Sequence, residues 1–484
     1  MIRPTTVEEL VDFLGRAMEI LRTSVPLQEH TDFVASLLVL KVLNDNFEEH
    51  GLRAESGSGT PPFYVPRRAR WDVLKGDPNP GDAINAAMTT LEGENAGLEG
   101  IFWGVDFNRL EPGLSKELIE LFSRLDLREQ RLLSPTAPGD AFEVMFERTA
   151  AQDRRSGELS TPPALAELMV RLASPQPRMD VCDPACGLGG FLTRCAPYVE
   201  ESGAPSRAGA ARVYGTERNR TLWARGRMNL LLHRLPPAHL SLGNALTGTE
   251  GPPRQYDRVV THPPFSARGW SDGLSQEQLR ERLPFGFPSR NSGDFAWIQH
   301  AYTSMKVGGA AVVLMPWGVL FRRETDGEIR RAMLKYGVIE GVVSLPAKLL
   351  YATPTPTVIL IMRRHSASVT DAPVFFLDAT AYPDLRDAQG LSPAAVRHLS
   401  QIYHDREEIA GCARMVPFGE IVRHDFVLNP GLYVQPDSAT APVHVEQTRE
   451  RIRVLEKRGR SLARRMDRVI DEMQRNEPGA SAGE

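Results

Sequence analysis

The sequence predicts an α/β fold, in which a doubly wound, Rossmann-like sheet follows a helical N-terminal domain and precedes a C-terminal helix. Apolar residues at helical spacing fill the first 145 residues, short apolar runs alternate with helical segments from 146 to about 425, and near-heptad spacing appears after 435. A chain of 484 residues also exceeds one ordinary domain. We therefore expect domains at 1–145, 146–435 and 436–484.

Composition narrows the class of protein. The chain is 42% apolar and 24% charged, as globular proteins are, and it shows neither a secretory leader nor an apolar run long enough to span a bilayer. We expect a cytoplasmic protein without membrane contact. A net charge of −4 excludes a generally cationic surface, so binding to DNA would need local basic patches or a partner. The four cysteines lack zinc-site spacing, which predicts reduced structural thiols and no metal.

The N-terminal region has the pattern of a packed helical domain. Thr6 and Glu9 form a capping box, and apolar residues from Val7 to Leu21 then recur at helical spacing. Helical periodicity continues at 33–47, 83–91 and 115–125, while residues 56–62 (SGSGTPP) have the composition of a flexible loop.

The central region has the pattern of strands that helices cover on both faces. Several apolar runs are continuous rather than alternating, which is typical of strands buried on both sides. Ligands of such sheets bind at the carboxyl ends of the strands. The predicted strands are 179–182, 212–215, 258–261, 310–315, 339–344, 357–362 and 374–377.

A glycine-rich segment, 183–192 (DPACGLGGFL), follows the first predicted strand. Gly187, Gly189 and Gly190 permit a tight turn into a helix N-terminus, whose free N–H groups face a ligand. Asp183, just before the turn, is placed to bind the ammonium of a methionine-like group. The spacing differs from the dinucleotide fingerprint, so an ordinary strand-to-helix turn also explains these glycines.

Two further polar residues follow later strands. Glu217 ends the strand at 212–215 and is placed to accept both hydroxyls of a ribose, by the logic of nucleotide-binding sheets. Asn244, in the segment 242–246 (LGNAL), carries an amide suited to an adenine edge. Taken singly, each is equally well explained as a solvated polar side chain.

The segment 256–265 (YDRVVTHPPF) is the most informative in the chain. An apolar strand runs into a polar residue, two prolines and an aromatic ring, which is how amino-methylating enzymes hold a base. That pattern has Asn, Asp or Ser where this chain has His262.

The order of these motifs resembles that of DNA N6-adenine methyltransferases, specifically the methylation subunits of type I restriction–modification systems. The resemblance covers nearly the whole chain and includes a segment similar to the family's Gly-Glu-Phe-Tyr-Thr-Pro cofactor motif at 157–163 (GELSTPP). Further matching segments are 65–66, 70–71, 98–102, 105–108, 314–321, 329–330, 343–346, 354–357 and 425–434.

The resemblance implies S-adenosyl-L-methionine as cofactor and a flipped-out adenine as substrate. In the family, the Asn oxygen and the first proline carbonyl accept the hydrogens of the adenine amine, and the aromatic ring stacks on the base. The base would lie against His262, Pro263, Pro264 and Phe265. The implied cofactor residues are Thr161, Pro162, Asp183, Ala185, Gly187, Gly189, Glu217 and Asn244.

His262 leaves three interpretations open. In the first, a neutral imidazole offers its one acceptor nitrogen in place of the Asn oxygen, and the chain is an active methyltransferase. Alternatively, the ring marks a catalytically impaired scaffold in a defence or regulatory complex. The third interpretation is an enzyme that methylates a protein or small-molecule amine. Asn244, where the family usually has Asp, and Leu159-Ser160, in place of an aromatic pair, are further departures.

The resemblance also implies partners. Apolar residues near heptad spacing between Val445 and Met473 predict a helix that packs on a partner's helices, and the family's partner there is a DNA specificity subunit. We expect the N- and C-terminal helices to dock on that subunit, with double-stranded DNA as substrate. A second copy of the chain and a nuclease or translocase subunit are further possible partners. The tail 477–484 has a disordered composition.

Overall fold

The computed structural model describes residues 5–22, 24–54, 63–152, 161–201, 211–248, 255–289, 291–347, 349–350, 355–382 and 390–434. By contacts the chain divides into two compact units, Met1–Val434 and Gln435–Glu484, and all described residues belong to the first. The predicted C-terminal helix and tail, the loop 56–62, residues 157–160 and Pro354 lie outside the described residues.

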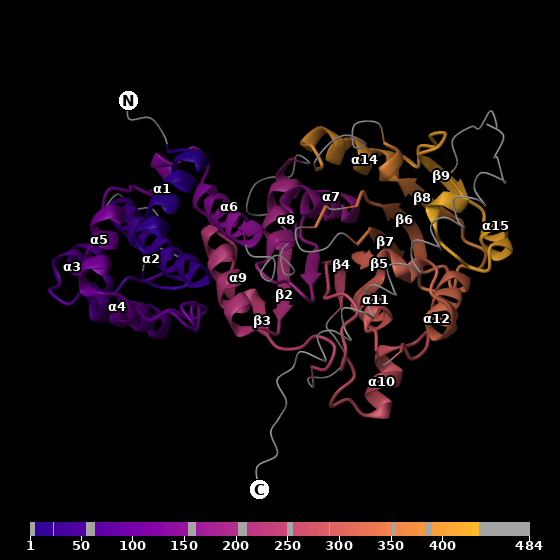
Figure 1. The fold of residues 1–484 in the computed structure, drawn as a ribbon, viewed down its shortest axis with the longest axis horizontal. Coiled ribbons are helices and arrows are strands. Elements are labelled where there is room, and N and C mark those ends of the chain that lie inside the picture. The colour runs from indigo at the N-terminus through magenta and orange to yellow at the C-terminus, as the bar shows by residue number, and fades with distance from the viewer. Residues whose placement is uncertain are drawn as a thin grey trace, which may run out of the picture. The chain divides into compact units, whose positions relative to one another are not determined.

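The N-terminal part is helical, as the sequence predicts (Figure 1). The capping box is present: the Glu9 N–H donates to Thr6 Oγ1 at 3.2 Å, and the Thr6 N–H donates to a Glu9 carboxylate oxygen at 3.0 Å. The second helix is buried along most of its length, because its apolar residues occupy every face. The helices are α1 (Val7–Ile20), α2 (Leu27–Ala54), α3 (Trp71–Gly76), α4 (Pro80–Glu94), α5 (Pro112–Phe122) and α6 (Ala137–Gln152).

The central part contains one sheet of nine strands within the described residues, in the order β3-β2-β1-β4-β5-β7-β6-β8-β9. β3, β2, β1, β4 and β5 are parallel, whereas β7 runs antiparallel to both its neighbours. The strands are β1 (Asp180–Asp183), β2 (Arg212–Glu217), β3 (Leu240–Leu242), β4 (Tyr256–Thr261), β5 (Met305–Pro316), β6 (Ile339–Ser344), β7 (Thr357–Arg363), β8 (Val374–Asp378) and β9 (Ala413–Val416).

Helices cover both faces of this sheet, which confirms the doubly wound prediction (Figure 1). Val260 and Val312 pack with α7 (Pro163–Ala173), α8 (Gly190–Glu201) and α14 (Pro393–Asp405). Their neighbours Val259 and Val313 point to the opposite face, where they pack with α11 (Asp294–Thr303) and α12 (Glu324–Lys335). All seven predicted strands are present, and β3 and β9 were not predicted.

Helix α9 (Arg220–Leu232) joins the helical part to the sheet. Met228, Leu231 and Leu232 belong to the apolar core of the helical part, while Leu230 belongs to the core beside the sheet. The predicted domain division at 145/146 falls inside α6, which packs on α9. The helical part therefore has its core completed by a helix from the central region.

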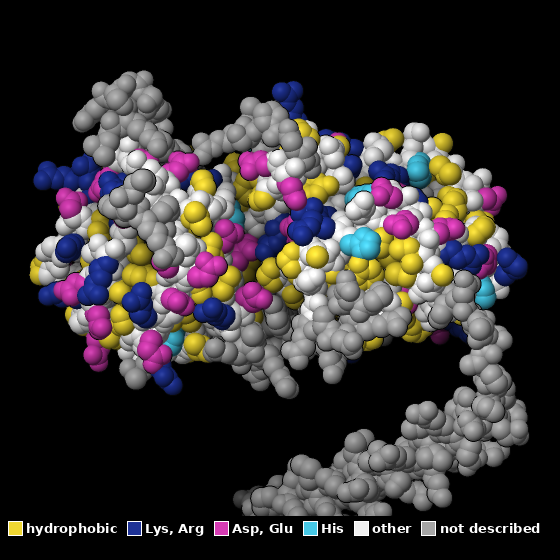
Figure 2. Space-filling model, turned by 90° about the horizontal axis from the view of Figure 1, so that it is seen from above, with side chains coloured by type: hydrophobic (Ala, Val, Ile, Leu, Met, Phe, Trp, Pro, Cys, Tyr) yellow, Lys and Arg dark blue, Asp and Glu magenta, His cyan; other side chains and the backbone are white. Residues whose placement is uncertain are grey.

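All four cysteines are buried and form no disulfide, in agreement with the sequence prediction. None of the described helices is both long enough and apolar enough to cross a membrane. On the face that Figure 2 shows, acidic and basic side chains are interspersed and do not form a single basic stripe.

Candidate functional site

A cavity of about 720 Å³ lies at the carboxyl ends of β1, β2 and β4. This is the edge of the sheet where a doubly wound fold binds ligands, and the volume suits a small molecule. Ten of the twelve predicted site residues line it, namely Thr161, Asp183, Ala185, Gly187, Glu217, Asn244, His262, Pro263, Pro264 and Phe265.

Asp183 is fully buried at the end of β1. Its Oδ1 accepts hydrogen bonds from Thr261 Oγ1 at 2.7 Å and from the Ala185 N–H at 3.0 Å. Its Oδ2 is buried and has no hydrogen-bond partner among the described residues. Burial raises the pKa of Asp183 to about 7, and the nearby Glu217 carboxylate acts in the same direction. A cation from a ligand would supply the missing partner of Oδ2.

The glycine turn after β1 is tied to the end of β2. Gly187 has φ +52°, a left-handed backbone that glycine adopts without strain. Its N–H donates to one Glu217 carboxylate oxygen at 3.1 Å, and the Asn219 N–H donates to the other at 2.7 Å. Glu217 therefore holds the turn while it lines the cavity.

Two predicted cofactor residues do not line the cavity. Gly189 lies in the turn at φ +79°, where a Cβ would stand 2.8 Å from Leu230 Cδ1, so its position is set by close packing on α9. Pro162 begins α7, and its carbonyl accepts the Leu165 and Ala166 N–H groups. Both residues shape the backbone beside the cavity.

Asn244 lies in the loop after β3, and its Oδ1 accepts the Leu246 N–H at 3.1 Å. This bond fixes the amide in the wall of the cavity. The short strand β3 therefore matters to the site although its three residues escape detection by pattern.

His262 is half-buried directly after β4. Its Nδ1 lies 2.8 Å from Thr161 Oγ1, and its ring lies 5.0 Å from the Phe265 ring between centroids. Burial lowers the pKa of His262 to about 4, so the imidazole is neutral at pH 7 and keeps one acceptor nitrogen.

Two residues that sequence reasoning missed hold the double-proline corner. Asp294, fully buried at the start of α11, accepts the Ser266 N–H at 2.7 Å. Arg322 lines the cavity and donates to Asp294 at 2.6 Å and to Ser292 Oγ at 3.1 Å. The sequence signal that could have identified Asp294 is a carboxylate at the start of the apolar run 294–298.

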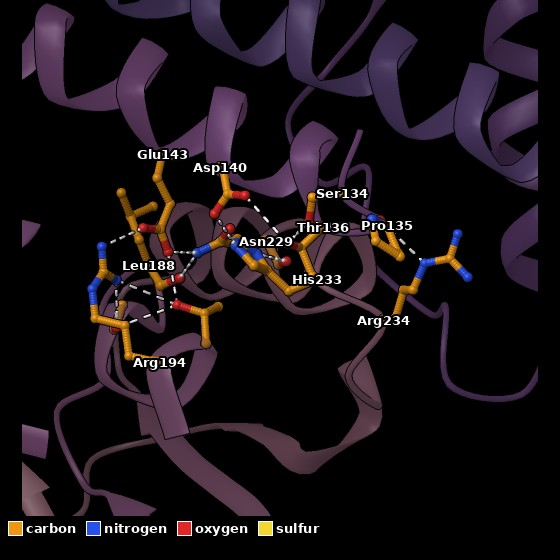
Figure 3. Close-up of polar contacts among 12 residues, drawn as sticks. Ser134, Pro135, Thr136, Asp140, Glu143, Leu188, Arg194, Asn229, His233 and Arg234 are labelled. Carbon is orange, nitrogen blue, oxygen red and sulfur yellow. Dashed lines mark hydrogen bonds and ion pairs between the residues drawn. The ribbon is translucent and has the colours of Figure 1, made fainter. Parts of the chain in front are cut away.

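Helix α6 of the helical part also lines the cavity, through Glu143 and Glu147. Figure 3 shows Glu143 with its polar partners. Glu143 forms an ion pair with Arg194 at 2.8 Å and accepts hydrogen bonds from Thr193 Oγ1 and Asn229 Nδ2. Neither this helix nor any site residue within it was identified from the sequence.

Comparisons with known proteins agree with this arrangement, which is that of a Rossmann-like methyltransferase fold. The family model described as N-6 DNA Methylase matches residues 134–441, and the model described as HsdM N-terminal domain matches residues 10–122. Because the first match covers more than half of the sequence, the chain belongs to the N-6 DNA methylase family. The family resemblance predicted from the motifs is confirmed.

Individual relatives point the same way. The type I restriction enzyme MjaVII methylase subunit of Methanocaldococcus jannaschii is 26% identical over 369 residues, covering 73% of this chain and 62% of that protein. The HindI methylase subunit of Haemophilus influenzae is 25% identical over 72% of this chain and 82% of its own length. A type I restriction-modification methyltransferase subunit from Streptococcus thermophilus has the same fold, with TM-score 0.76 and 22% identity over 89% of this chain and all of that one.

Proposed function

We propose that this chain is the methylation subunit of a type I restriction–modification-like complex and methylates N6 of adenine in DNA, with S-adenosyl-L-methionine as methyl donor. One observation carries the proposal: a single cavity holds both the carboxylate and glycine groups suited to the cofactor and the proline corner suited to a base. Membership of the N-6 DNA methylase family supports the same chemistry.

The residues present fit this cofactor. The unpartnered Oδ2 of Asp183 would bind its ammonium, Glu217 its ribose hydroxyls and Asn244 its adenine. The turn that follows Gly187 would present backbone N–H groups of the α8 N-terminus to its carboxylate. When bound, the cofactor supplies an electrophilic methyl group.

The base would enter from the duplex as an extruded nucleotide, because its amine is unreachable inside the stack. The Pro263 carbonyl and His262 Nε2 would each accept one hydrogen of the adenine amine, which directs the nitrogen lone pair at the methyl group. Nε2 accepts only if Nδ1 carries the proton, so in this proposal Nδ1–H donates to Thr161 Oγ1. Phe265 would stack on the base, a contact worth about 1–3 kcal/mol.

Partners complete the proposal. The net charge of −4 and the interspersed charges on the face shown in Figure 2 favour a separate DNA specificity subunit as the main source of DNA affinity. Docking would use the N- and C-terminal helices, and a second copy and a nuclease subunit would complete the assembly.

The alternative function is a catalytically impaired scaffold, and His262 in place of the usual amide favours it. The two are separated by transfer of labelled methyl groups to adenine-containing duplex DNA, with the specificity subunit present, by wild type and His262→Asn. We expect both proteins to transfer. Transfer by the Asn variant alone would establish the scaffold, and failure of both despite bound cofactor would exclude DNA adenine as substrate.

A further inference from the structure

The glycine turn is held by side chains that meet at Glu143 of α6, more than 40 residues earlier in the sequence (Figure 3). Asn229 Nδ2 donates both to Glu143 Oε1 at 3.0 Å and to the Leu188 carbonyl at 2.8 Å. Arg194 pairs with the other Glu143 oxygen and donates to the Gly190 carbonyl at 2.6 Å. The two carbonyls that flank Gly189 are thus fixed by groups anchored on one carboxylate.

Charge reinforces this anchor. Burial would raise the pKa of Glu143, but Arg194, His233 and the Asn229 amide outweigh it and lower that pKa to about 2. Glu143 is therefore ionised at any working pH. Arg194 is itself mostly buried, so removal of the Glu143 charge would leave a guanidinium without its counter-ion in the wall of the cavity.

The position of Glu143 is set by close packing of α6 on α9. A Cβ on Gly139 would stand 2.3 Å from His233 Nδ1, so the ring fits against α6 only because residue 139 lacks a side chain. His233 contacts the Asn229 carbonyl through Nδ1 at 3.0 Å and Asp140 through Nε2 at 3.4 Å. Glu143 lies one helical turn beyond Gly139, on the same face of α6.

We propose that Glu143 of α6 is a positioning residue of the cofactor site. Through Asn229 and Arg194 it holds the glycine turn in the shape that receives the amino-acid end of the cofactor. The nucleoside end would depend chiefly on Glu217 and Asn244, which lie at the end of β2 and after β3. This inference rests on the proposed function for the identity of the cofactor.

The experiment compares two ligands that share a nucleoside. Isothermal titration calorimetry on the full chain would measure the affinity for S-adenosylmethionine and for adenosine in wild type and in Glu143→Gln. The Gln amide cannot neutralise Arg194, and hydrogen bonds to charged groups contribute more than those between neutral groups. We expect a loss on the order of tenfold or more for S-adenosylmethionine and less than about threefold for adenosine.

Two further variants keep the test decisive. Glu117→Gln makes the same substitution at an exposed glutamate of α5 and should leave both affinities unchanged. Thr193→Val removes one bond to Glu143 while preserving shape and charge, so it should lower the affinity for S-adenosylmethionine selectively even if Glu143→Gln does not fold.

The outcomes separate the two proposals. Equal losses for both ligands, or no loss for S-adenosylmethionine, would overturn the role of Glu143. A wild-type chain that binds neither ligand would overturn the proposed cofactor and this inference with it.

Discussion

The unpartnered carboxylate of Asp183 gives cofactor binding a defined pH dependence. The pKa of Asp183 is about 7 in the folded chain, against an ordinary value of 3.8. Only the ionised form attracts an ammonium, so binding below pH 7 must first remove a proton. The apparent affinity for S-adenosylmethionine should fall about tenfold at pH 6 and about a hundredfold at pH 5.

The raised pKa of Asp183 also makes the stability of the ligand-free chain depend on pH. Stability falls over the same pH range in which the affinity for the cofactor rises. The folded carboxyl holds its proton up to about pH 7, whereas the unfolded one releases it near pH 4. Between these values the folded chain binds more protons, so the free energy of unfolding falls as pH rises. The gap corresponds to as much as roughly 4 kcal/mol at pH 8. Asp183→Asn avoids this cost and should stabilise the ligand-free chain at pH 8 more than at pH 5.

The assay is calorimetric titration of S-adenosylmethionine between pH 5 and 8, alongside urea denaturation of the ligand-free chain. Asp183→Asn should bind weakly and lose the rise in affinity between pH 5 and 7. An α-amine itself releases its proton at about pH 7.7–8.0, so wild-type affinity should peak between about 7 and 8. An affinity that is flat from pH 5 to 7, or a pH dependence that survives in Asp183→Asn, would refute the role of this carboxylate.

Two further predictions concern the supports around the site. Arg322→Met leaves the buried Asp294 carboxylate without the guanidinium that pairs with it. We therefore expect the free energy of unfolding, measured by urea denaturation, to fall by about 3 kcal/mol. The double variant R322M/D294L should recover part of this loss. A single variant as stable as wild type would contradict this. Gly139→Ala places a methyl group against His233. The substitution should destabilise the chain by about 1–3 kcal/mol and lower Tm in a thermal melt. An unchanged Tm would show that the His233 ring moves aside freely.

The sequence is informative wherever the chemistry is local. Asp183, the glycines and the 262–265 corner each follow a strand directly, so the strand predictions alone place them at one edge of the sheet. The structure brings ten of the twelve predicted residues into one cavity. His262 shows the limit of this approach, because its neutrality depends on burial that its neighbours in sequence do not determine.

Support from distant segments was not predictable. Glu143 and Arg194 are 51 positions apart, and Ser266 and Asp294 are 28 apart, so no periodicity links them. Strand β3 has only three residues, which is too short for a pattern, and the four-residue strand β9 was also missed. The apolar run of β7 predicts a buried strand but carries no information about direction, so its antiparallel place between β5 and β6 required the structure.

Helix α9 has a practical consequence for anyone dividing this chain. Met228, Leu231 and Leu232 complete the apolar core of the helical part. A fragment ending near residue 150 would therefore expose the apolar surface that these residues cover. The remaining fragment would expose the apolar face of α9. Protein engineers who exchange specificity by swapping modules should therefore keep α1 to α9 from one parent.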